Sequence, residues 1–258
     1  MGFHCQGLSK SYATRNGPIE ALRDVTFKVA AEEFVCIVGP SGCGKTTLLK
    51  LVAGLARPTS GCIVFDSDPN VPAPPRALVF QEHGLFPWMT LLDNVAFGLK
   101  MRGMGRRERN ERARVFVDKF GLAGFADSFP HELSVGMSQR VAIARAFVSD
   151  PGILLMDEPF GSLDVQTKWV LEDELMRIWR EHRKMVVYVT HDIEEAVLLG
   201  DRVLVMSGRP GTIRAEVPIP LARPRELRDR DRPEVVEWTW QIWRMLEDEV
   251  RKSLRAPS

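Results

Sequence analysis

The chain has 258 residues, 45% of them hydrophobic and 27% charged, which is typical of a globular protein with a large core. Its formal net charge of +1 gives no electrostatic reason to expect binding to nucleic acid or to an anionic membrane surface. The sequence has no run of 18 apolar residues and no signal-peptide stretch, so it predicts neither a membrane span nor export.

The four cysteines form no CxxC pair and have no short spacing to histidine, which argues against a zinc site. A disulfide framework is not expected in a chain of this length. Reduced thiols in a cytosolic compartment fit best, and any work at a membrane requires another protein to hold the chain there.

Short β-branched runs alternate with amphipathic helical stretches, which predicts an α/β fold with a mostly parallel core sheet. The expected strands are residues 25–29, 34–38, 153–156, 185–190 and 202–206. A helix is expected over residues 45–55, because Gly54 and Pro58 follow as stop signals.

Between about residues 90 and 150 the strand signal disappears, which predicts a helical insertion in the α/β core. Its charged stretch, residues 102–114, is interpreted as a solvated helix face rather than an anion site, because acidic residues are interspersed. Residues 218–233 predict a charged, proline-rich connector. Apolar residues at helical spacing follow, and packing of that last helix on its own core is favoured over docking of a partner.

A glycine-rich loop, GPSGCGKTT at residues 39–47, follows an apolar strand and opens a helix. This setting is the one that a phosphate-binding loop requires, because glycines let backbone N–H groups turn around phosphate oxygens. Lys45 would reach the β- and γ-phosphates, and Thr46 would ligate Mg²⁺. The nucleotide-binding candidates are Gly39, Pro40, Ser41, Gly42, Cys43, Gly44, Lys45, Thr46 and Thr47.

Cys43 is an unusual residue inside this loop. If its thiol is accessible, we expect alkylation to block nucleotide hydrolysis and prebound nucleotide to protect it. The alternative is a shielded, unreactive cysteine.

The apolar run ILLM ends in Asp157, and Glu158 follows at once. A buried strand that ends in an acid delivers the carboxylate to the ligand edge of an open α/β sheet. Asp157 suits a contact to Mg²⁺, and Glu158 can accept a proton from the attacking water.

With these motifs the chain resembles the ATP-binding-cassette (ABC) ATPases. Further motifs follow in the family's order: FQE at 80–82 resembles the Q-loop, LSVGMSQR at 133–140 the signature, GSLD at 161–164 the D-loop, and VVYVTHD at 186–192 the switch-histidine strand. The resemblance implies a P-loop NTPase core with an antiparallel β N-terminal part and a helical ABC-specific insertion. It also implies an ATPase domain over residues 1–218, with the connector and last helix, 219–258, packed on it.

The resemblance implies roles for the remaining candidates. Tyr12 would stack on adenine, and Gln81 would sense Mg²⁺ and the attacking water. His191 would hold the γ-phosphate and orient the water together with Glu158. Ser134 and Gly136 would contact the γ-phosphate bound by a second copy, and Asp164 would belong to the same nucleotide site. Independently, Ser134 can N-cap a helix through residue 145 and aim its positive end at an anion.

The signature departs from the family's Ser-Gly-Gly, because Val135 stands where the family has glycine. A β-branched residue disfavours positive φ, so this residue would strain closure of the dimer if it lies close to the nucleotide.

Residues 81–95, residues 206–211 and the ARPR connector resemble the importer subfamily for nitrate, sulfonates and taurine. This implies a peripheral subunit on the cytoplasmic face of the inner membrane, bound to transmembrane permease subunits and working indirectly with a solute-binding protein. One chain carries both halves of the site, so a homodimer is simplest, and a heterodimer with a sister ATPase stays open. Phe86, Pro87 and Trp88 would line a cleft for the permease or pack in the helical insertion.

Three other readings remain. A soluble ABC ATPase of DNA maintenance or translation would need a long coiled coil or two cassettes, which do not fit 258 residues. An exporter would need no solute receptor. A non-hydrolysing regulatory subunit would be consistent with Val135.

Overall fold

A computed structural model describes residues 2–15, 17–66, 74–81 and 84–255 of the chain. They form two compact units: unit 1 consists of Met1–Pro74 and Lys184–Ser258, and unit 2 of Pro75–Arg183. Within the described ranges, no helix combines the length and the apolar character that a bilayer span requires.

The core of unit 1 is a set of parallel strands with one antiparallel edge. Strand β3 (Phe34–Val38) pairs in parallel with β7 (Met185–Thr190) on one side and β8 (Arg202–Met206) on the other, and β9 (Ile213–Pro218) runs antiparallel to β8. Every residue of β3 and β7 is buried, as expected for parallel strands covered on both faces. Strands β3, β7 and β8 confirm the strands predicted at residues 34–38, 185–190 and 202–206, whereas β9 was not predicted.

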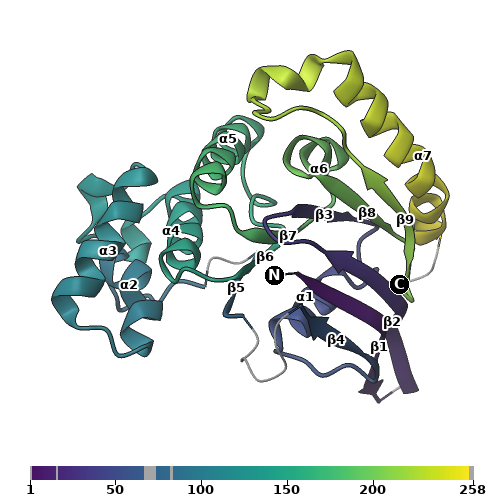
Figure 1. The fold of residues 1–258 in the computed structure, drawn as a ribbon, viewed down its shortest axis with the longest axis horizontal. Helices are drawn as coiled ribbons and strands as arrows, with labels where there is room; N and C mark the ends of the chain where they lie inside the picture. Colours follow the sequence, from purple (N-terminus) through teal and green to yellow (C-terminus); the bar gives the residue numbers. More distant parts are fainter. Residues whose placement is uncertain (1, 16, 67–73, 82–83, 256–258) are drawn as a thin grey trace. The chain divides into compact units, whose positions relative to one another are not determined.

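Four helical elements accompany these strands: α1 (Lys45–Ala53), α6 (Ile193–Leu199), η3 (Leu227–Asp231) and α7 (Pro233–Arg255). Helix α1 ends two residues before the predicted end, where Gly54 adopts a left-handed C-cap. The long helix α7, yellow in Figure 1, lies along α6 and η3. Its buried residues Val235, Ile242 and Leu246 follow helical spacing.

A second sheet of unit 1 is antiparallel, with the order β2-β1-β4, and is drawn in purple to blue in Figure 1. It contains β1 (Phe3–Thr14), β2 (Gly17–Val29) and β4 (Ser60–Phe65). The predicted strand 25–29 is therefore the end of a much longer one. This sheet is the antiparallel N-terminal part that the resemblance implied.

Unit 2 combines two parallel strands, β5 (Arg76–Val79) and β6 (Ile153–Asp157), with a helical segment. Its helices are α2 (Leu91–Met101), α3 (Arg106–Lys119), η1 (Ala123–Phe125), η2 (Pro130–Glu132), α4 (Val135–Val148) and α5 (Val165–His182). The predicted helical insertion is confirmed. On α3, exposed ion pairs such as Arg107–Glu111 join neighbouring turns, in agreement with a solvated charged face.

Candidate nucleotide-binding site

The phosphate loop of unit 1 connects the buried end of β3 to the first turn of α1. Gly42 and Gly44 have φ values of 74° and 106°, in the left-handed region that only glycine adopts without strain. Gly44 is the N-cap of α1 and offers no side-chain cap. Because the first N–H groups of a helix lack intrahelical acceptors, this end of α1 is suited to an anion.

Lys45, the first residue of α1, is only 6% exposed. Its ammonium Nζ donates to the carbonyl oxygens of Gly39, at 2.9 Å, and Pro40, at 3.3 Å. The loop carbonyls thus hold the cation over the loop, beside the positive end of the helix. Thr46, the next residue, is exposed. The loop therefore concentrates positive charge where a phosphate would bind.

Sequence reasoning missed the contacts that support the phosphate loop from behind. A methyl group on Gly211 would lie 2.1 Å from the Cys43 carbonyl oxygen, and one on Gly44 would lie 2.8 Å from the Ala21 carbonyl oxygen. Gly211 also donates from its N–H to Ala21 O at 2.9 Å. Backbone packed against backbone at these points fixes the loop, and the Gly-Arg-Pro-Gly run at 208–211 was the available signal.

The thiol of Cys43 is shielded. Its side chain is 1% exposed, and an added methyl group on Gly39 would lie 2.9 Å from its Sγ. Cys62, by contrast, is exposed. Of the two readings of Cys43, the shielded cysteine agrees with the structure, so alkylation of this residue requires the loop to open.

Tyr12, the residue expected to stack on adenine, lies on β1 opposite Ile19 of β2. Its side chain is 39% exposed, and the Nζ of Lys10 lies 4.9 Å from the ring centroid. The ring is therefore partly open to solvent and carries a neighbouring cation.

His191 occupies the turn between β7 and α6 and is exposed. The hydroxyl of Thr190 accepts from the Asp192 N–H at 3.0 Å, and the Asp192 carboxylate caps α6 at the Glu195 N–H, at 3.2 Å. Glu195, 2% exposed, accepts hydrogen bonds from the hydroxyls of Tyr188 and Thr190. These buried side chains hold the turn on both sides of His191.

Sequence reasoning missed the buried group formed by Tyr188, Thr190 and Glu195. A tyrosine inside an otherwise aliphatic strand, followed by an acid in the first turn of the next helix, was the signal for it.

In unit 2, Asp157 ends β6 with 7% exposure, and Glu158 follows in a left-handed conformation with φ of 45°. The Gly161 N–H donates to the Glu158 carbonyl at 3.1 Å and closes the turn. A non-glycine residue at positive φ costs of order 1 kcal/mol and is enriched at functional sites. The backbone thus stores strain at the residue proposed as the base.

Asp164 has a structural task of its own as the N-cap of α5. Its Oδ1 accepts from the Thr167 N–H at 3.0 Å, and this backbone hydrogen bond, followed by one from the Thr167 side chain, lowers the pKa of the carboxyl below its usual range. The residue is exposed and ionised at neutral pH.

Ser134 caps the signature helix, as predicted: its Oγ accepts from the Met137 N–H at 3.2 Å. Helix α4 continues to Val148, three residues beyond the predicted end, because apolar residues continue into the core. A methyl group on Gly136 would lie 3.1 Å from Thr167 Cγ2 of α5.

Val135 is the first residue of α4 and is 52% exposed. It is not among the residues with positive φ, so its backbone carries no positive-φ strain, and the effect of its side chain on closure of a dimer stays a prediction. A helical backbone accommodates a β-branched side chain here.

Gln81 lies just after β5 and is exposed. Glu82 of the predicted Q-loop and His83 of the stretch that resembles the importer subfamily lie outside the described residues. Downstream, Phe86 packs against Phe97 with a ring-centroid distance of 4.4 Å, whereas Trp88 is 69% exposed. The Phe86 ring thus packs in the helical segment, whereas the Trp88 ring is exposed and could contact a partner.

Thr46 and Asp157, the residues expected to contact Mg²⁺, carry oxygen donors. Among the described residues, no group of three His, Cys, Asp or Glu side chains could hold a metal ion. Mg²⁺ in phosphate sites takes one or two protein oxygens and completes its shell with phosphate oxygens and water. Thr46, an exposed residue of unit 1, carries a hydroxyl, and Asp157 of unit 2 carries a strand-end carboxylate; each is a ligand of this kind.

Comparison with known proteins agrees with these features. The chain matches the ABC transporter family over residues 22–161, more than half of its length. It is 46% identical to the nitrate import ATP-binding protein NrtD of Synechocystis sp., over 86% of this chain and 84% of that protein. It is 47% identical to the taurine import ATP-binding protein TauB of Burkholderia thailandensis, over 84% of each.

Among solved structures, the dimeric post-hydrolysis state of the ATP-binding cassette MJ0796 bound to ADP and Pi is similar, with a TM-score of 0.75 and 32% identity. The match covers 85% of this chain and all of that one. The P-loop NTPase fold, the phosphate loop and these relatives lead to one conclusion: the chain belongs to the ABC transporter family, as one of its ATP-hydrolysing subunits.

Proposed function

We propose that the chain energises an importer of a small solute such as nitrate, taurine or another sulfonate. The observation that carries this proposal is the phosphate loop with buried Lys45, in a chain related to import ATPases for nitrate and taurine. In such an importer the solute is selected by a receptor and by the permease, so this subunit supplies free energy from ATP hydrolysis. Residues 1–218 form the ATPase domain in this proposal.

We assign the following roles within one copy. Lys45 and the backbone N–H groups of residues 39–47 bind the phosphates, and Tyr12 stacks on the adenine. Glu158 accepts a proton from the attacking water, and His191 orients that water and contacts the γ-phosphate. Fixed donors and a positioned base are the main sources of rate enhancement in phosphoryl transfer.

Mg²⁺ would be held by Thr46, Asp157 and Gln81, and when bound it would neutralise charge on the phosphate oxygens. Their oxygen donors are the kind that this ion prefers. Gln81 would also report the state of the site to the permease.

The second half of each site comes from a second copy. Ser134, Gly136 and Asp164 would face the nucleotide bound by the partner, so two copies arranged head to tail complete two sites. The exposed, capped start of α4 supports this role, and the related cassette MJ0796 forms a dimer. A homodimer is the simplest assembly, and a sister ATPase would serve equally well.

The remaining partners are transmembrane permease subunits and, through them, a solute-binding protein. The subunit would be peripheral, on the cytoplasmic face of the inner membrane. Exposed Trp88, beside the packed ring of Phe86, is our candidate contact with the permease.

The test replaces the proposed base. Glu158→Gln keeps the size of the side chain and removes its basicity, so we expect the rate of phosphate release to fall at least about 100-fold while ATP still binds. Glu132→Gln, at an exposed acid of η2, is the matched control and should keep wild-type turnover. Equal turnover of wild type and Glu158→Gln would instead support a regulatory subunit.

The transport partners need a separate measurement. The chain should co-purify with permease subunits, and ATP turnover of the complex should rise when a nitrate- or sulfonate-loaded receptor is added. An increase of ATP turnover without any receptor, together with outward movement of solute, would indicate an exporter.

A further inference from the structure

The position of His191 depends on a helix that is too short to be stable by itself. Helix α6 begins two residues after His191 and has only seven residues. Isolated helices shorter than about 12 residues are marginal in water, so α6 must be held by tertiary contacts. Whatever holds α6 also determines where the His191 turn lies.

At its N-terminal end α6 is tied to β7. The Glu195 carboxylate accepts from the hydroxyls of Tyr188 and Thr190, and all three residues are nearly inaccessible to solvent. These bonds connect the first turn of α6 to the strand that leads into His191.

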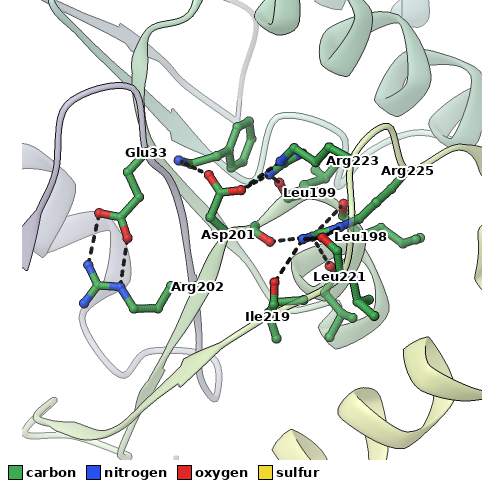
Figure 2. A network of polar contacts seen from close by, with 12 residues as sticks. Glu33, Leu198, Leu199, Asp201, Arg202, Ile219, Leu221, Arg223 and Arg225 are labelled. Carbon is green, nitrogen blue, oxygen red and sulfur yellow. Dashed lines mark hydrogen bonds and ion pairs between the residues drawn. The ribbon is translucent and has the colours of Figure 1, made fainter.

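At its C-terminal end α6 is tied to the connector that follows β9, through Arg225. The Arg225 guanidinium donates to the carbonyl oxygens of Val197, at 2.9 Å, and Gly200, at 2.6 Å, and more weakly to that of Leu198. The same group donates to Ile219, at 3.1 Å, and Leu221, at 2.7 Å. Figure 2 shows the guanidinium between the two segments that it joins.

Burial of the Arg225 guanidinium costs free energy that an ordinary surface arginine does not have to overcome. Arg225 is 7% exposed, and burial, reinforced by the nearby positive charge of Arg223, lowers the pKa of its guanidinium to about 10. Among the described residues, the hydrogen bonds of the guanidinium go to backbone carbonyls rather than to a carboxylate. The negative end of the α6 peptide dipoles partly compensates the cation. A buried charge kept in this way fixes the relative position of two backbone segments.

Two neighbouring arginines reinforce the same connection. Arg223 donates to the Leu199 carbonyl at 2.6 Å and pairs with Asp201 at 2.7 Å. Arg230 of η3 forms an ion pair with Glu194 in the first turn of α6. The segment after β9 therefore holds both ends of the helix.

We propose that Arg225 is a positioning residue for ATP hydrolysis, holding α6 and thereby the His191 turn in the geometry that the reaction needs. This inference rests on the role proposed above for His191. It makes the connector, which lies far along the chain from the phosphate loop, a determinant of turnover rather than of nucleotide binding. A displacement of about 1 Å at a catalytic group can cost up to about 100-fold in rate.

The experiment is a double-mutant cycle on the full chain, with phosphate release from radiolabelled ATP as the readout. Arg225→Met should lower kcat about 10-fold and change the KM for ATP less than about 2-fold. In the His191→Ala background the same substitution should change the residual rate less than about 2-fold, because the group that it positions is absent. Arg225→Lys, which keeps the charge but not the fork of donors, should fall between wild type and Arg225→Met.

Arg228→Met, at an exposed arginine of the same connector, is the matched control and should keep wild-type turnover. Thermal unfolding is measured for every variant, and if Arg225→Met is unfolded at the assay temperature, Arg225→Lys takes its place in the cycle. The inference would be overturned if Arg225→Met lowered turnover by the same factor in the wild-type and His191→Ala backgrounds. Unchanged turnover of folded Arg225 variants would also overturn it. Wild-type turnover of His191→Ala would instead refute the role proposed for His191.

Discussion

The phosphate loop and the signature segment both lead into the N-terminus of a helix, yet they are built in opposite ways. At α1 the helix start is backed by packed backbone, with a glycine cap and Lys45 folded onto its own loop. At α4 the cap is the side chain of Ser134, and Val135 beside it is half exposed. The start of α1 is held by contacts within one chain. The start of α4 can exclude water from an anion only when another surface covers it, which is what a partner copy would do.

The largest effect in this comparison of the two helix starts is expected for Lys45→Ala. Removal of the ammonium deletes the main positive charge of the loop, so we expect ATP turnover to fall at least about 100-fold and ATP affinity to fall with it. The measurement is phosphate release combined with equilibrium nucleotide binding. Lys50→Ala, at an exposed lysine of the same helix, is the control. Normal consumption of ATP by Lys45→Ala would refute the proposed site.

A smaller effect on ATP turnover is expected for a substitution at the start of α4. Ser134→Ala removes the cap of α4 and should lower the free energy of unfolding by about 1 kcal/mol. Because the serine is assigned to the partner's nucleotide, turnover should fall about 10-fold while ATP affinity of the isolated chain is unchanged. Denaturant unfolding, phosphate release and nucleotide binding are compared with those of Ser138→Ala, one turn further along. Weaker ATP binding by the isolated chain would contradict this assignment and place Ser134 in the same half of the nucleotide site as Lys45.

The smallest effect is expected for Val135→Gly, which restores the family's glycine. The helical backbone of Val135 needs no positive φ, so this substitution should preserve or slightly raise turnover and leave ATP affinity alone. Glycine in a helix costs roughly 0.5–1 kcal/mol relative to alanine, so a small loss of stability is expected. A large fall in hydrolysis would show that the valine is integral to this signature.

The parallel strands could be predicted from sequence almost to the residue, because a strand buried on both faces is a continuous apolar run. Residues 34–38, 185–189 and 203–206 are such runs, and the predicted strands that contain them, 34–38, 185–190 and 202–206, match the structure. Strands β1 and β4 of the antiparallel sheet gave no comparable signal. They are partly exposed and interrupted by register shifts, so polar and apolar residues do not alternate regularly.

At the candidate site the motif residues could be located, but not the contacts that hold them. Spacing identified Lys45, because a phosphate-binding loop requires a lysine at that place, whereas the resemblance to the ABC ATPases identified His191. Spacing could not reveal that Glu195 anchors the turn of His191 or that Arg225 anchors the helix behind it. Such contacts join segments distant in sequence, and only folding brings them together.

The close approach of Gly211 to the carbonyl of Cys43 has a consequence for affinity. With backbone behind it at van der Waals distance, the phosphate loop has little freedom to collapse or rearrange before a nucleotide arrives. Binding therefore needs little ordering of the loop, and more of the interaction energy remains as affinity, which is the benefit of preorganisation.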